Sequence, residues 1–142
     1  MTAPCSEETQ GKQVADVLAG CVQRAVAETL KSILGDKPTV SGDDNLLSGS
    51  ERVVGLISFS GEPPFVFLLG IPAETAPSLV LKFTGMEFDF ESKDMGDVVG
   101  ELINVVAGEV VAQVERAGMK AAMGLPTVAR GKDVDMVAGG RN

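Results

Sequence analysis

Residues 97–106, DVVGELINVV, lie at the centre of the longest helical pattern in the chain. At 100° per residue, one face of this helix gathers Val99, Leu102, Ile103, Val106 and Val110, and we predict that it packs against a sheet. The opposite side carries a polar column made of Asp97, Glu101, Asn104 and Gly108. Asparagine and glycine lower helix stability by roughly 0.5 and 1 kcal/mol relative to alanine. The column is therefore a candidate functional surface, although its spacing alone also fits an ordinary solvated face.

The ends of this helix carry the expected capping signals. Ser92 suits the N-cap, and the acidic Asp94 and Asp97 lie in or near the positive first turn. Arg116 falls in the last turn, and Gly118 is placed to end the helix. We therefore predict one helix of about 25 residues.

The rest of the chain predicts a second long helix and a small sheet. Apolar residues at steps of three and four predict a helix over residues 14–33, with Cys21 on its buried face as a small core thiol. Residues 52–59 and 65–69 are rich in β-branched and aromatic residues and predict a hairpin. A short helix is expected within residues 73–84. Residues 121–131 suit an extended segment in which Pro126 requires an edge or a bulge.

The length of 142 residues fits one domain. We expect a polar N-terminal tail over residues 1–12, a single domain over residues 13–131 and a short C-terminal tail over residues 132–142. A Ser/Gly/Asp-rich loop is expected over residues 41–50.

Composition narrows the possible functions. The formal charge of -8, from 20 acidic and 12 basic residues, argues against nucleic acid and membrane surfaces as partners. Histidine is absent, which removes the commonest metal ligand and general base. Two cysteines, Cys5 and Cys21, form neither a disulfide framework nor a zinc site, so a cytoplasmic location is expected. No apolar run approaches the roughly 18 residues needed to span a bilayer.

Several motifs together resemble a known family. An acid, a glutamate and an asparagine at Asp97, Glu101 and Asn104 match the signature of the CheC/CheX/FliY group of bacterial chemotaxis phosphatases. The GELIN stretch followed by Ala107 and Gly108 resembles the family's helix, and residues 125–128, LPTV, resemble the strand after it. The likeness spans roughly residues 14–131 and is greatest to CheX. It implies an α+β fold: a β-sheet with two long helices packed on one face. Because only eleven residues follow Gly131, we expect the family's C-terminal strands to be shortened.

The resemblance implies a phosphatase that hydrolyses the aspartyl phosphate of a CheY-type response regulator. Asn104 would orient the attacking water, because an amide can position a molecule but cannot act as a base. Glu101 would dock a lysine of the regulator, while Asp97 and Gly108 would contact the same partner. No cofactor is expected on this chain, because the Mg²⁺ belongs to the partner's receiver domain. The resemblance further implies a homodimer. The Glu-x-x-Asn pattern occurs once in the sequence, so one active site per chain is expected.

Two other functions remain open on the sequence. A non-catalytic adaptor of the same fold would bind a receiver domain or a flagellar switch component without hydrolysis. A stand-alone structural domain would bind no receiver at all. Loss of Asn104 separates the first alternative from the phosphatase, because an adaptor with an intact interface would tolerate it.

Overall fold

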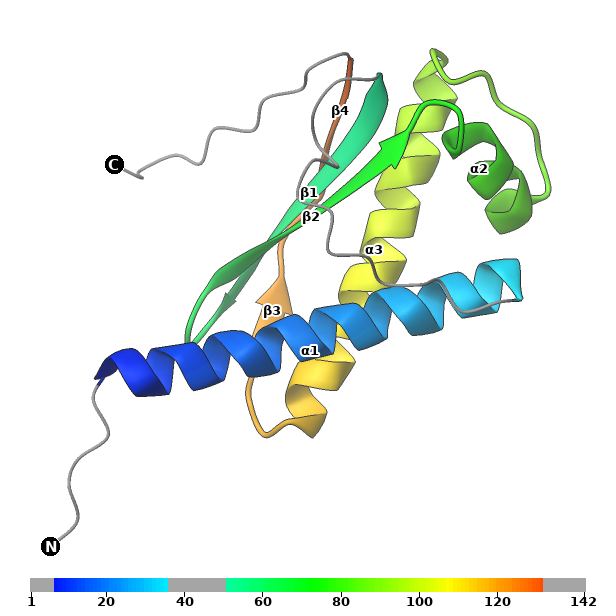
Figure 1. The fold of residues 1–142 in the computed structure, drawn as a ribbon. Helices are drawn as coiled ribbons and strands as arrows, with labels where there is room; N and C mark the ends of the chain where they lie inside the picture. The colour runs from blue at the N-terminus through cyan, green and yellow to red at the C-terminus, as the bar shows by residue number, and fades with distance from the viewer. Residues whose placement is uncertain (1–6, 36–50, 132–142) are drawn as a thin grey trace, which may run out of the picture.

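The computed structural model describes residues 7–35 and 51–131, shown in colour in Figure 1. Its elements are α1 (Glu7–Leu34), β1 (Arg52–Gly61), β2 (Phe65–Pro72), α2 (Ala76–Thr84), α3 (Lys93–Arg116), β3 (Ala121–Met123) and β4 (Thr127–Gly131). This order confirms the predicted sequence of helix, hairpin, short helix, long helix and extended segment. Cys5, the predicted loop at 41–50 and the predicted C-terminal tail lie outside the described residues.

Strand β1 is the centre of an antiparallel sheet. It pairs with β2 on one side, where Phe59 lies opposite Phe65. On its other side β1 pairs first with β3 and then with β4. These two strands follow one another along the same edge of β1 and are separated at residues 124–126. Proline has no N–H to give to a ladder, and the break at Pro126 satisfies the predicted need for an edge or a bulge.

The two long helices share the sheet's buried face. Along β1 the side chains of Val53, Ile57 and Phe59 are buried in the same core as Cys21 of α1 and Ile103 of α3. Full burial of an aliphatic side chain such as that of Ile103 stabilises a fold by about 1.5–3 kcal/mol. Figure 1 shows α1 crossing the C-terminal half of α3. This arrangement confirms the predicted α+β architecture with two long helices on one face.

Helix α1 begins at Glu7, earlier than residue 14, where the apolar pattern placed its start. The extra turns contain no apolar stripe, so periodicity gave no signal there, whereas acidic residues near a helix N-terminus are favourable to the macrodipole. Cys21 is completely buried and is a free thiol, as predicted.

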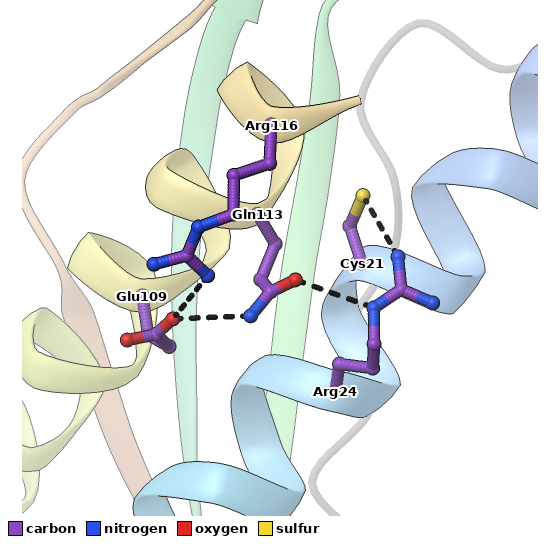
Figure 2. Close-up of polar contacts among 5 residues, drawn as sticks. All are labelled: Cys21, Arg24, Glu109, Gln113 and Arg116. Carbon is purple, nitrogen blue, oxygen red and sulfur yellow. Dashed lines mark hydrogen bonds and ion pairs between the residues drawn. The ribbon is translucent and has the colours of Figure 1, made fainter. Parts of the chain in front are cut away.

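A chain of polar contacts joins α1 to the end of α3, as Figure 2 shows. Arg24 of α1 donates from Nε to Oε1 of Gln113 at 3.2 Å and from Nη2 to Sγ of Cys21 at 3.7 Å. Gln113 in turn donates to Glu109 at 3.2 Å, and Arg116 lies 3.7 Å from the same carboxylate oxygen. These contacts link α1 to the C-terminal part of α3 beside the shared apolar core.

The ends of α3 follow the capping signals in the sequence. The hydroxyl of Ser92 accepts a hydrogen bond from the backbone N–H of Met95 at 3.1 Å, and Asp94 lies in the first turn. Gly118 follows the helix with φ +86°, a left-handed conformation that glycine adopts at little cost. Within the described residues, no helix is both long and apolar enough to cross a membrane.

Candidate functional site

Helix α3 presents its polar column to solvent. The predicted apolar stripe is fully buried: Val99, Leu102, Ile103, Val106 and Val110. On the other side Asp97 and Glu101 are exposed, and Asn104 is half-buried. The structure thus separates the two faces as the 100° periodicity predicted.

Three of the four column residues line one open groove. The groove has a volume of about 760 Å³ and lies between α3 and β4. Asp97, Glu101 and Asn104 contribute to its α3 wall. Val128 and Arg130 of β4, with Pro126 directly before the strand, contribute to the facing wall. Alternation along the strand explains the second wall, because every second residue of β4 points to the same face.

Two glycines give the groove its depth. Gly96 and Gly100 lie one turn apart on α3 and both line the groove. A Cβ atom added at Gly96 would meet nothing within 4 Å, and one added at Gly100 would lie 3.8 Å from Cγ2 of Val128. Side chains at these positions would therefore fit, but they would fill space that the glycines leave to a ligand or a partner.

The amide and the two carboxylates on the α3 wall of the groove have no side-chain partners within the described part of the chain. The Asn104 amide makes no side-chain hydrogen bond there, and neither Asp97 nor Glu101 forms an ion pair there. An amide has two donors and one acceptor, and a carboxylate accepts from cations. The site therefore offers a positioning group and two anions to an incoming molecule.

Gly108 lies apart from the other three column residues. It lines a second hollow of about 480 Å³ between α1 and α3, beside Glu28, Val105 and Glu109. Helical spacing placed Gly108 in the column, but Gly108 lines the hollow between α1 and α3 and is not among the residues that line the groove.

Sequence reasoning missed two basic residues of the groove, Lys93 and Arg130. Arg130 donates from Nη1 to the carbonyl oxygen of Phe90 at 2.7 Å and also to that of Ser92, so it ties β4 to the start of α3. Residue spacing in the sequence was sufficient to place both residues on the groove side of their elements. Lys93 precedes Asn104 by three helical turns, and Arg130 is two residues after Val128 on the strand.

The family model of the chemotaxis phosphatase CheX matches residues 53–141, a stretch that contains the whole groove. The chain belongs to the CheX family. No group of three or more carboxylate, cysteine or histidine side chains placed to hold a metal ion occurs among the described residues. Comparison with curated proteins finds no significant match.

Solved CheX structures share the fold. The CheX protein of Vibrio vulnificus is 20% identical, with a TM-score of 0.69 over 84% of this chain and 82% of that chain. The CheX protein of Desulfovibrio desulfuricans is 19% identical, with a TM-score of 0.66 over 81% and 78%. A complex of CheX with CheY, BeF3 and Mg²⁺ from Borrelia burgdorferi matches at 17% identity, with a TM-score of 0.62 over 88% and 82%.

Proposed function

We propose that this protein hydrolyses the aspartyl phosphate of a CheY-type response regulator and that Asn104 orients the attacking water. One observation carries the proposal: in an open groove, a CheX-family helix presents an amide beside a carboxylate, and neither side chain has a partner among the described residues. The test is the rate at which a phosphorylated, Mg²⁺-loaded receiver loses its phosphoryl group with and without this protein.

The chemistry requires little of this chain beyond positioning. Water attacks the phosphorus, the bond from phosphorus to the aspartyl oxygen breaks, and the products are inorganic phosphate and a free aspartate carboxylate. The transition state of phosphoryl transfer is loose, so placing the water in line supplies much of the catalysis. The carbonyl of Asn104 accepts a hydrogen bond from that water, and no proton transfer to the amide is needed.

Glu101 is proposed to dock the partner. It lies one turn before Asn104, where its carboxylate can pair with a lysine next to the phosphoaspartate. Such a pair holds the amide over the phosphorus while the receiver supplies the Mg²⁺ site. The Borrelia burgdorferi complex, in which a CheX protein binds CheY with BeF3 and Mg²⁺, supports this division of roles.

Replacing Glu101 with glutamine is expected to raise the KM for the phosphorylated receiver about tenfold. Loss of one partner of a desolvated charge pair commonly costs about 2 kcal/mol or more, and solvent exposure reduces that cost here. Steady-state dephosphorylation measures the change. Glu115→Gln is the matched control, because Glu115 is an exposed glutamate on the same helix outside the groove. Equal KM values for the two variants would remove Glu101 from the interface.

Asp97 and Gly108 are proposed as further partner contacts. Asp97 lies one turn before Glu101 in the same groove and would contact the rim of the receiver. Gly108 leaves helical backbone uncovered in its own hollow, where a second segment of the receiver can approach closely. With its CheY-type partner, the protein is expected in the cytoplasm.

A homodimer remains a prediction. The outer edge of β2 pairs with no strand among the described residues, and Val66 on this strand is 56% exposed. An unpaired edge with apolar side chains is suited to pairing with another chain. Light scattering at micromolar concentration is expected to give twice the chain mass of 14.7 kDa, and a monomer mass would contradict the dimer.

A receiver-binding adaptor of the same fold is the second candidate. The same exposed carboxylates would serve it, and only the effect of Asn104 on turnover separates the two functions.

A further inference from the structure

The groove extends well beyond the two proposed catalytic residues. Lys93 and Asn104 both line it and are eleven residues apart on α3. At about 1.5 Å per residue this separation is roughly 16 Å, and three full turns bring both residues to the same side of the helix. In the proposed complex, the phosphoryl group and the lysine ammonium group of the receiver occupy only the end of the groove at Asn104. The opposite end is therefore free to meet another part of the partner.

That opposite end is basic in an acidic protein. Its charged side chains are Lys93 from α3 and Arg130 from β4, with Asp97 one turn further along α3, so this end carries a net positive charge although acidic residues outnumber basic ones 20 to 12 in the chain. Neither base forms an ion pair within the described residues. This holds even though Asp97 follows Lys93 by four residues on the same helix, a spacing at which opposite charges can pair. Both cations remain available to an anion from outside.

Arg130 is held in place for this role. Its Nη1 donates to the carbonyl oxygens of Phe90 and Ser92, which fixes the guanidinium at the end of the groove. Its other N–H groups make no hydrogen bond to described residues. A guanidinium anchored on one side loses less conformational entropy when it binds a carboxylate on the other.

We propose that Lys93 and Arg130 form a second contact, which binds a carboxylate on the surface of the phosphorylated receiver domain roughly 16 Å from the phosphoaspartate. The inference rests on the proposed function, because it takes the receiver as the occupant of the groove. Charge complementarity selects a carboxylate as the group bound. With a net charge of -8, most of this protein's surface repels an acidic region of a partner. The end of the groove that holds Lys93 and Arg130 can instead accept a carboxylate. The contact selects among receivers, since only those with an acidic residue at that distance can use it.

The contact acts over a short range. Glu91 and Asp94 flank Lys93 in the sequence, but neither lines the groove. Their negative charges, and that of Asp97 inside the groove, oppose the field of the two bases at longer distance, so the bases act on a carboxylate in direct contact rather than by steering. At an ionic strength of about 0.1 M, exposed charges are screened beyond roughly 10 Å, and the contact is expected to weaken with salt.

The test measures binding and turnover separately. Binding of a phosphorylated, Mg²⁺-loaded CheY-type receiver is measured by titration in an Asn104→Ala background, in which the phosphoryl group persists. Two variants are compared in that background at low and high salt: the single substitution Lys93→Gln, and the double substitution that adds Arg130→Gln. Lys93→Gln is the primary variant because Lys93 makes no described side-chain contact, whereas Arg130→Gln also removes two hydrogen bonds to backbone. Lys120→Gln is the control, an exposed lysine outside the groove.

Lys93→Gln is expected to raise the Kd about threefold to fivefold at low salt, and the double variant about tenfold or more, the usual scale for exposed charge contacts. The difference from the background should shrink at high salt, and Lys120→Gln should bind like the background. With Asn104 intact, Lys93→Gln should raise KM and leave kcat within about twofold. Unchanged Kd values in both variants would overturn the contact while leaving the phosphatase standing. Binding that depends on Lys93 without any turnover by the wild type would overturn the phosphatase and leave the contact. Absence of binding would overturn both.

Discussion

Asn104→Ala is expected to reduce the acceleration of receiver dephosphorylation at least about a hundredfold, the usual loss on removing one positioned catalytic group. The reason is geometric: alanine keeps the helix and the groove but removes the only amide side chain among the described residues that line it. The measurement is the single-turnover loss of phosphoryl group from a Mg²⁺-loaded receiver at saturating concentrations of this protein. Saturation confines the comparison to the chemical step.

Asn104→Ala is not expected to destabilise the fold, so a loss of activity can be assigned to the missing amide. Asn104 is half-buried and makes no side-chain hydrogen bond within the described residues, and alanine is the better helix former by roughly 0.5 kcal/mol. The variant should therefore unfold at the same denaturant concentration or slightly higher.

Asn104→Asp tests the amide more narrowly, because it keeps the shape but loses the donors and adds a negative charge beside the phosphoryl group. If Asn104→Ala binds the receiver and still accelerates dephosphorylation like the wild type, Asn104 is not the water-orienting group. If the wild type binds without any acceleration, the adaptor is the correct function.

The α3 wall of the site was predictable because its residues are close together in the sequence, within one helix. A helix of known phase fixes which residues share a face, so the buried stripe at Val99 and Ile103 and the polar side at Asp97 and Glu101 followed from 100° steps alone. The capping residues Ser92 and Gly118 are local signals of the same kind. Family resemblance then gave Asn104 a chemical role that spacing could not give.

The other wall depends on contacts that periodicity does not contain. Arg130 reaches the groove because β4 pairs antiparallel with β1 and lies beside the first turns of α3. That pairing is set by a register between residues more than seventy positions apart in the sequence. The place of Gly108 in a separate hollow depends in the same way on the packing of α1 against α3, across which Arg24 bonds to Gln113. Tertiary packing, rather than helix phase, decided both outcomes.

Gly55→Ala is expected to destabilise the fold by about 1–3 kcal/mol, the usual cost of overpacking a core. A Cβ atom built on Gly55 of β1 would lie 2.5 Å from Cγ1 and 2.7 Å from Cδ1 of Ile103, distances at which the isoleucine must move. Ile103 is completely buried on α3, directly before Asn104 in the chain. A methyl group on the sheet therefore pushes on the helix that carries the site. Urea unfolding at constant m-value measures the loss.

A double-mutant cycle shows whether this clash is the cause. Ile103→Ala alone should cost about 2–5 kcal/mol, because it removes buried methyl groups and leaves a cavity. In the Ile103→Ala background, the two clashing atoms are gone. The nearest remaining side-chain atom at position 103 is Cβ, which lies 3.8 Å from the new methyl group, an ordinary contact distance. Adding Gly55→Ala should then cost little or restore some stability by filling the cavity, so the two changes should be strongly non-additive. Additive costs would mean that strand backbone effects at Gly55, and not contact with Ile103, set its preference for glycine. Non-additivity would show that the closeness of β1 to α3, which positions Asn104 over the groove, depends on the missing side chain at residue 55.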